Sequence, residues 1–446
     1  MDPKRLFDTQ QERPPDQADT SPIGGGRVRL RCANRRQVAF RASALDDLLP
    51  DDHRARLVWA YVEGLDFAPL YEQIQAVEGY AGRPAADPRI LMALWLYATL
   101  EGVGSARALA RLCEDHVAYQ WICGDVSMNY HTLADFRTAH GEFLDRLLTE
   151  SVATLMHEGL VDIERVAQDG MRVRASAGAA SFRREPTLEQ CLAEAETQVR
   201  KLREELENDP AAGNARQKAA RERATRERKE RVQKALAELQ KIRAKKKLKD
   251  RDKARASTTD PEARVMKMAD GGYRPAYNVE FATDTETQVI VGVDTINTGS
   301  DQGQMSPMVE QIERRYDKSP KEMLVDGGFA KKEDIEKVSA PEGNTTVYAP
   351  VQKSKDPNRE AHTPRADDTR VIAEWRRRMA TDEAKEIYKE RAATAECVNA
   401  IARNRGFRQF PVRGSPKVRV ITLWYALAHN LMRAVALRAE VPAEAC

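Results

Sequence analysis

Residues 161–174, VDIERVAQDGMRVR, decide the fold, because here the chain first alternates as a β-strand does. Asp169 stands in the middle of this predicted strand, between Gln168 and Gly170. Aspartate and glycine are both poor strand formers, so a carboxylate at this position indicates a role other than building the strand.

The elements that follow have an order typical of an α/β protein. Residues 277–296 predict a β-hairpin with its turn near 284–287. Short strands are expected at 321–325 and 345–349, with helices at about 302–316, 331–338 and 381–404. Mixed strands flanked by helices predict an α/β sheet, which we place at residues 160–414.

A helical hairpin is predicted as an insert at residues 183–256, between the first strand and the β-hairpin. Both halves carry apolar residues three or four apart, separated by the helix-breaking residues 209–214. The seam consists of Leu188, Leu192, Ala195, Val199, Leu202 and Leu206 in the first half and of Val232, Leu236, Leu239 and Ile242 in the second. This coiled-coil-like seam can pack against itself or against a second chain.

The ends of the chain differ from this central part. Residues 1–43, with little periodicity, predict a poorly ordered N-terminus, and residues 415–446 predict a C-terminal helix and tail. Residues 44–150 predict short helices, with Asp87 and Ser105 placed as caps. Helix-turn-helix modules and plain bundles share this pattern, so DNA binding and dimerisation both stay open for this module.

Composition narrows the function class. The net charge is +3, but residues 200–255 hold 21 Lys or Arg against 10 Asp or Glu, a net of +11, which leaves −8 for the remainder. A basic segment on an acidic body indicates a polyanionic partner, although a solvated helical face gives the same count. The length of 446 residues predicts two or three domains.

The chain carries no evident signal for a membrane or for export. Apolar stretches such as residues 90–100 are too short to cross a bilayer, and the first twenty residues have no apolar signal core. The six cysteines form no CxxC pair, which argues against a zinc site and a disulfide framework. We therefore expect a cytoplasmic protein without a membrane partner.

Three acidic residues stand out by position. Asp169 lies within a strand, Asp326 ends a strand in LVDGGF, and Glu396 lies inside the predicted helix 381–404. Carboxylates converging from separate elements can hold two magnesium ions, which activate a hydroxyl and stabilise the leaving oxygen of a phosphodiester. Ordinary surface acids remain the alternative, because the chain holds 69 Asp and Glu.

Many ordered segments resemble the DDE transposases of bacterial insertion sequences, in the IS-four and IS-five superfamily. The resemblance covers about residues 44–436. Its segments are GYAGRPAADPRILMALWLYATLEGVGSARALARLCEDHVAYQWICGD from Gly79, YHTLADFR at 130–137, QDGMRVRASA at 168–177, TDPEARVMK from Thr259, YNVEFATD from Tyr277, LVDGGF at 324–329, IYKERAATAE at 387–396 and FRQFPVRGSPKVRVITLWYALAHNLMR from Phe407.

The resemblance implies a ribonuclease-H-like catalytic domain in which Asp169, Asp326 and Glu396 are the catalytic metal ligands. Its tyrosine–arginine–glutamate signature implies supporting contacts to phosphate and DNA by Tyr388 and Arg391. Here four residues separate Arg391 from Glu396, against three in the strictest form of the signature. Arg403 stands where the signature usually has lysine, and on an ideal helix it lies about 20° from Glu396, whereas Arg391 lies about 140° away.

The activity implied by the resemblance is DNA transposition. The enzyme would bind the terminal inverted repeats of its element, nick the DNA ends with two Mg²⁺ ions, for which Mn²⁺ can substitute, and join the 3′ hydroxyls to target DNA. Its partners would be double-stranded DNA and further copies of itself, as a homodimer or larger oligomer, at the bacterial nucleoid. We assign DNA contacts to Arg172, Arg174, Arg243, Lys245, Lys246, Lys247 and Lys249.

Two rival functions remain at this point. A metal-dependent endonuclease on the same fold would cut DNA without joining it. A non-enzymatic DNA-binding protein would use the basic hairpin and would show no magnesium-dependent cleavage. Because a nuclease shares the chemistry, only an assay for joined products separates it from a transposase.

Overall fold

The computed structural model describes residues 43–76, 84–208, 215–340, 344–352 and 360–440, and all statements below concern these residues. The chain divides into two compact units, residues 1–47 and 48–446. Only residues 43–47 of the first unit are described, so the predicted disorder of residues 1–43 falls almost entirely outside the described residues, as do residues 441–446 of the predicted tail.

The predicted N-terminal helical region is confirmed. Asp87 accepts a hydrogen bond from the N–H of Arg89 at the start of α3, and Ser105 accepts one from Ala108 at the start of α4, as the sequence predicts. The helices are α1 (Arg54–Glu63), α2 (Ala68–Tyr71), α3 (Pro88–Leu100), α4 (Ala106–Asp115), α5 (Val117–Cys123), α6 (Tyr130–Ala139) and α7 (Gly141–His157).

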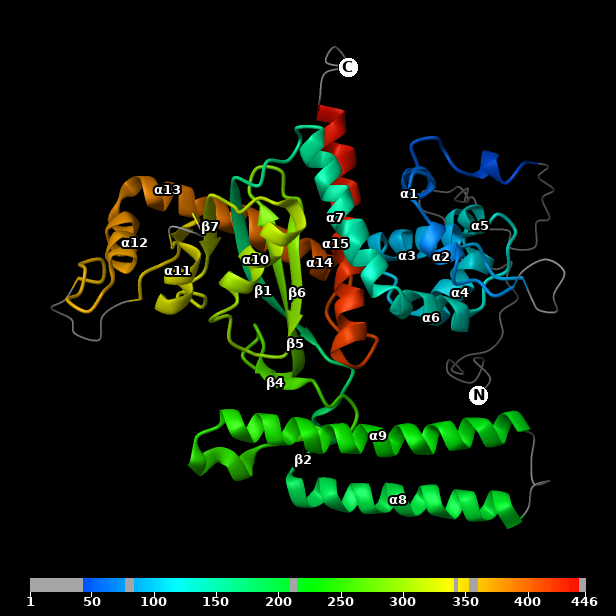
Figure 1. Ribbon diagram of the computed structural model, residues 1–446. Coiled ribbons are helices and arrows are strands. Elements are labelled where there is room, and N and C mark those ends of the chain that lie inside the picture. Colours follow the sequence, from blue (N-terminus) through cyan, green and yellow to red (C-terminus); the bar gives the residue numbers. More distant parts are fainter. Residues whose placement is uncertain (1–42, 77–83, 209–214, 341–343, 353–359, 441–446) are drawn as a thin grey trace, which may run out of the picture. The chain divides into compact units, whose positions relative to one another are not determined.

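A mixed sheet lies at the centre of residues 160–414, which confirms the predicted fold class (Figure 1). β1 pairs antiparallel with β5 and parallel with β7, β8 extends the parallel side, and β4 and β6 share the other edge of β5. The strands are β1 (Arg165–Arg174), β4 (Arg264–Lys267), β5 (Tyr273–Asp284), β6 (Ile290–Ile296), β7 (Glu322–Val325) and β8 (Thr346–Tyr348). The predicted hairpin at 277–296 is therefore the β5–β6 pair.

Two hydrophobic cores involve the residues of this sheet. Met171 and Phe281 belong to one core, together with the N-terminal helices and α15 (Ser415–Glu440). Ala282 belongs to the second core, together with α10 (Met305–Tyr316). The remaining helices of this region are α11 (Lys332–Val338), α12 (Arg370–Ala380), α13 (Asp382–Arg391) and α14 (Cys397–Asn404).

The long helix α15 joins the helical region to the sheet, because it packs against α7 and α3 as well as against β6. By length and composition alone it would suffice to cross a membrane, contrary to the sequence expectation that the apolar stretches are too short. However, 61% of its apolar window is buried within the fold. A helix buried to this extent is typical of the core of a folded domain.

The predicted inserted hairpin is confirmed as α8 (Glu185–Asn208) and α9 (Ala215–Lys245), which lie side by side as the two long green helices of Figure 1. Leu188, Ala235 and Leu239 are buried in the hairpin's own small core, so the seam packs against itself at this end. Residues 209–214 and the side chain of Leu206 lie outside the described residues. The short strands β2 (Phe182–Arg183) and β3 (Ala256–Ser257) pair at its base.

Candidate active site

Asp169 is held on the central strand β1, opposite Phe281 of β5. Its side chain is 18% exposed, and Asn399 of α14 donates a hydrogen bond from Nδ2 to Oδ2 at 2.8 Å. Burial raises the pKa of Asp169, as does the neighbouring Asp326, while Arg391 and Asn399 lower it. The carboxylate is thus desolvated and oriented by donors.

Asp326 reaches the same place through the sheet. In the parallel ladder of β1 and β7, Gln168 pairs with Val325, so Asp169 and Asp326 are the next residues on two neighbouring strands. The N–H of Gly328 donates to Asp326 Oδ1 at 2.7 Å, and Asp326 is 40% exposed. A carboxylate at a strand end beside two glycines is therefore accessible to a ligand.

Glu396 comes from a helix that is not the single α-helix expected at 381–404. Residues Ala392–Glu396 form a π-helical turn between α13 and α14. Such a turn takes up one additional residue, so Arg391 and Glu396 point to nearly the same side instead of lying 140° apart. The ideal-helix geometry was wrong here, and the additional residue between Arg391 and Glu396 lies in this turn.

Arg391 brings the three predicted acids together. Its guanidinium Nη2 lies 3.0 Å from Asp169 Oδ1 and 3.9 Å from Asp326 Oδ2, and Nη1 lies 3.4 Å from Glu396 Oε1. The arginine side chain is only 10% exposed, whereas that of Glu396 is 62% exposed. A cationic group therefore stands at the centre of three carboxylates that come from β1, from the end of β7 and from the π-turn.

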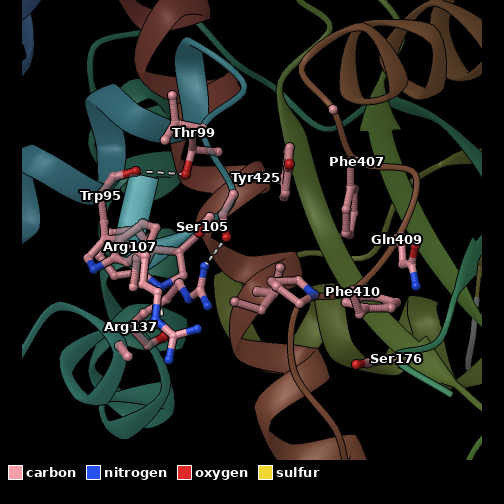
Figure 2. Close-up of a pocket in the computed structure, with 18 of the residues that line it drawn as sticks. Trp95, Thr99, Ser105, Arg107, Arg137, Ser176, Phe407, Gln409, Phe410 and Tyr425 are labelled. Carbon is pink, nitrogen blue, oxygen red and sulfur yellow. Dashed lines mark hydrogen bonds between the residues drawn. The ribbon is translucent and has the colours of Figure 1, made fainter. Parts of the chain in front are cut away.

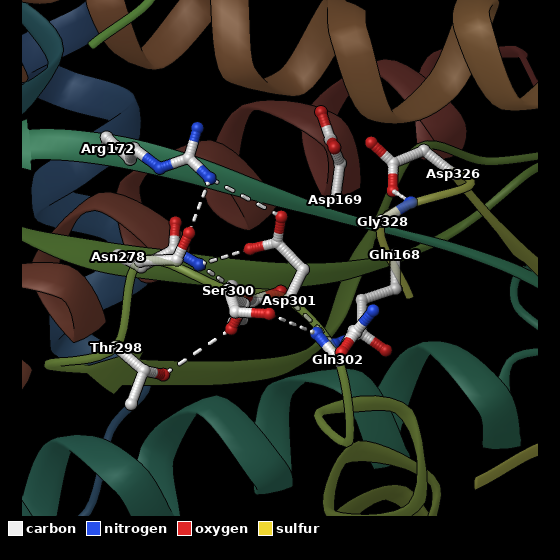
Figure 3. Close-up of polar contacts among 12 residues, drawn as sticks. Gln168, Asp169, Arg172, Asn278, Thr298, Ser300, Asp301, Gln302, Asp326 and Gly328 are labelled. Atoms are coloured by element: carbon white, nitrogen blue, oxygen red, sulfur yellow. Dashed lines mark hydrogen bonds and ion pairs between the residues drawn. The ribbon is translucent and has the colours of Figure 1, made fainter. Parts of the chain in front are cut away.

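A second polar network next to these acids was missed in the sequence (Figure 3). Asn278 Nδ2 donates to both Asp301 Oδ1 and Glu280 Oε1, each at 2.6 Å, and Arg172 lies 3.6 Å from Asp301 Oδ2. Burial raises the pKa of Glu280 and of Asp301, and the charge of Asp326 raises that of Asp301 further. Polar residues at alternate positions of a buried strand, Asn278 and Glu280, were the available signal.

Gly170 makes room for this network. A Cβ at this position would lie 2.8 Å from Asp301 Oδ1 and 2.9 Å from Glu280 Oε1, closer than side chains tolerate. The glycine beside Asp169, which looked out of place in a strand, is therefore required where carboxylates approach the backbone.

The supporting residues of the signature are placed differently from one another. Tyr388 is half-buried, and burial raises the pKa of its phenol, with Asp326, Asp169 and Glu396 acting in the same direction. Arg403 is exposed near the end of α14, and it forms no ion pair within the described part of the chain. Tyr388 thus lies beside the acids, while Arg403 pairs with no acid of the described residues.

The residues predicted to contact DNA fall into two groups. Arg172 is bound to Gly299 O at 2.9 Å and to Asp301, and Arg243 pairs with Glu185 at the base of the hairpin. Arg174 and the predicted lysines have exposed side chains, and the ion pairs of the described residues include none of them. The lysines are Lys245, Lys246, Lys247 and Lys249.

Comparison with protein families finds two matches. Residues 43–139 match the family described as a transposase domain (DUF772), and residues 240–431 match the transposase DDE domain. The chain belongs to the DDE transposases. The match to the DDE domain contains Asp326 and Glu396, while Asp169 precedes it, on the far side of α8 and most of α9. No curated protein and no solved structure matches the chain.

DDE transposases use divalent metal ions. In the described residues, no group of three or more His, Cys, Asp or Glu side chains is close enough to hold such an ion as it stands. The donor set nevertheless fits one, because the acids offer only oxygen ligands and already surround the guanidinium of Arg391 as a cation. Asp169, Asp326 and Glu396 are the residues that could hold it.

Proposed function

We propose that this transposase binds the terminal inverted repeats of an insertion sequence, nicks the DNA at the element ends and joins the freed 3′ hydroxyls to target DNA. In the first step water attacks phosphorus and the P–O3′ bond breaks, so the 3′ oxygen leaves as a hydroxyl. In the second step that hydroxyl attacks a target phosphodiester and displaces its 3′ oxygen. Both steps are phosphoryl transfers, so one site serves both.

The observation that carries the proposal is the convergence of Asp169, Asp326 and Glu396 on the single guanidinium of Arg391. We assign the three acids as catalytic residues that hold two Mg²⁺ ions, with Mn²⁺ as a substitute. The ions, when bound, polarise the scissile phosphate and activate the attacking hydroxyl.

The remaining groups of the site orient and bind. Asn399 holds Asp169 in place from α14, and Tyr388 presents a half-buried phenol beside the acids. Arg391 has donors for a phosphate oxygen once a divalent cation takes over the carboxylates, because a guanidinium binds phosphate with two parallel N–H groups. Arg403 is left as an exposed phosphate contact on α14.

We assign DNA binding to the basic end of the hairpin insert and to the helical module at residues 44–150. The exposed lysines at 245–249 form no ion pair within the described residues, so their charge is available to phosphates. Two element ends must be cut, so a homodimer or larger oligomer fits the task. The reaction takes place where the DNA is, at the nucleoid in the bacterial cytoplasm.

A cleavage and joining assay with duplexes that carry the element's own ends tests the proposal. Asp326→Ala and Glu396→Ala are compared with the wild type in Mg²⁺, and Glu383→Ala, an exposed acid on α13, serves as the control. We expect the wild type and the control to cut and join, and the two site variants to bind DNA without doing either.

The other outcomes are equally informative. Cutting by both site variants at the wild-type rate would show that the active site lies elsewhere. Cutting without joined products would identify a nuclease. DNA binding by the wild type without any cleavage would favour a binding protein.

A further inference from the structure

A pocket of about 620 Å³ lies between the helical region and the segment that links α14 to α15 (Figure 2). Its 19 lining residues include two arginines, Arg107 and Arg137, and six aromatic residues, but no aspartate or glutamate. Arg137 ends the motif YHTLADFR, to which the proposed chemistry gives no role. The lining is therefore cationic and aromatic.

Arg137 is a buried charge with no anionic partner among the described residues. Its residue is 7% exposed, and its Nε has no hydrogen-bond partner in that part of the chain. Nη1 donates to Gly104 O at 2.5 Å, and the guanidinium lies 4.4 Å from the ring centre of Trp95. No carboxylate of the described residues lies within 4.0 Å of it.

The charge of this side chain persists at neutral pH. Burial lowers the pKa of Arg137, but only to about 10. A buried charge without an ionic partner is costly, and folded proteins pair such groups or place them where a ligand completes the pair. The pocket therefore presents a charge that an anionic ligand can pair with.

Arg107 provides a second cation at the rim. It is exposed on α4, its guanidinium lies 5.0 Å from the ring centre of Tyr130, and it forms no ion pair within the described residues. The exposed Arg413, which does not line the pocket, donates from Nε to the carbonyl oxygen of Ser176, which does. A third cation thus lies next to a lining residue.

The pocket is connected to the candidate active site through the backbone. Ser176 follows β1, seven residues after Asp169, and the N–H of Phe410 donates to Arg174 O at the end of that strand. At about 3.3 Å per residue this separates pocket and acids by roughly 20 Å. Along B-DNA that distance is about six or seven base pairs.

We propose that this pocket binds a phosphate of the DNA strand whose end lies at Asp169, Asp326 and Glu396. Arg137 and Arg107 hold the phosphate, and the adjoining sugar and base lie against the half-buried rings of Tyr130 and Tyr425. The inference rests on the proposed function, since it names a DNA contact of that reaction. Arg137 is therefore a binding residue whose charge serves a ligand and not the stability of the fold.

Two readouts test the pocket, on Arg137→Met, Arg107→Ala and the control Arg314→Ala, an exposed arginine on α10. The first is the shift in Tm caused by inorganic phosphate, against chloride at the same ionic strength. The second is the affinity for a duplex with an element end, measured over a salt series.

We expect Arg137→Met to unfold in chloride at the wild-type Tm or above it, because an apolar side chain replaces an uncompensated buried charge. The phosphate-induced Tm shift should disappear in that variant. DNA affinity should fall by about 10-fold or more for each charge-assisted hydrogen bond that the variant no longer makes. The salt slope should fall by about one for each phosphate that is no longer neutralised. Arg314→Ala should match the wild type.

The proposal is overturned if Arg137→Met keeps both the phosphate response and the DNA affinity. It is also overturned if the phosphate response disappears while DNA affinity stays, because the pocket would then serve a free anion. If Arg137→Met unfolds early, Arg107→Ala decides, since that side chain is exposed: unchanged binding overturns the proposal, and weakened binding supports it. If the wild-type protein binds the DNA but never cuts it, the proposed transposition is refuted and the pocket assignment stands.

Discussion

Replacing Arg391 by methionine separates two roles of its guanidinium. The group stabilises the metal-free fold, and it competes with a divalent ion for the three carboxylates. The link to Asp169 spans 3.0 Å between side chains that are 10% and 18% exposed. A hydrogen bond to a charged group of this kind contributes about 1.5–3 kcal/mol. The pair with Glu396, which is 62% exposed, adds less than about 1 kcal/mol after solvent screening. We expect Arg391→Met to lose about 2–3 kcal/mol of unfolding free energy in EDTA.

A divalent cation should stabilise Arg391→Met more than it stabilises the wild type. At 100 times its dissociation constant, a bound ion adds about 2.7 kcal/mol to the unfolding free energy. In the wild type the guanidinium must first leave the carboxylates, so part of that gain is lost. Arg391→Met has no such competitor, so Mn²⁺ should stabilise it more than the wild type.

Denaturant unfolding in EDTA and in Mn²⁺ measures both effects. Arg377→Met, an exposed arginine on α12, is the control and should behave as the wild type in both buffers. Equal stabilisation of Arg391→Met and the wild type by Mn²⁺ would refute the idea that Arg391 occupies the ion's place. No loss of stability in EDTA would refute the assigned strength of the Asp169 link.

Three further predictions concern single features of the fold. Burial lowers the pKa of His429 to about 4. As the pH falls, the unfolded chain therefore takes up a proton at this histidine before the folded chain does. Stability present above pH 6.5 is then lost as the pH falls toward 4, by about 3 kcal/mol. His429→Gln keeps a donor for Gln288 O, and its unfolding free energy, measured in urea, should fall by that much less between pH 6.5 and 4. A fall as large as that of the wild type would contradict the assignment. Gly170→Ala should cost about 1–3 kcal/mol of unfolding free energy, because its Cβ meets the carboxylates of Asp301 and Glu280, whereas Gly178→Ala, with open space, should be neutral. Replacing the four hairpin lysines by alanine should lower the salt slope of DNA binding by about one for each phosphate that they neutralise, and an unchanged slope would remove the hairpin from the DNA interface. These are Lys245, Lys246, Lys247 and Lys249.

The fold was predictable from the sequence because its elements have clear local signals. The alternation in β1 and the β5–β6 hairpin gave the strands, and the side-chain caps Asp87 and Ser105 marked two helix starts. The convergence of Asp169 and Asp326 followed from their places in two strands, once those strands pair in parallel.

What the sequence did not reveal depends on contacts between distant segments or on departures from ideal geometry. A helical wheel assumes one angle per residue, so the π-turn at Ala392–Glu396 was missed and Arg391 was placed away from Glu396. The approach of Asp301 to Asn278 joins residues 23 positions apart, and Asp301 lies in the irregular loop that follows β6. Arg243 was counted as free charge, yet Glu185, from the other helix of the hairpin, neutralises it.

The base of the hairpin makes the arm a separable part of the molecule. Because Phe182 pairs with Ser257 and Arg183 with Ala256, the chain leaves and re-enters at neighbouring positions. Adding or removing whole turns of α8 and α9 beyond the β2–β3 pair changes the length of the arm by about 1.5 Å per residue in each helix. The register of β1 stays the same. Evolution or protein engineering can therefore change the reach of the arm without altering the residues at Asp169, Asp326 and Glu396.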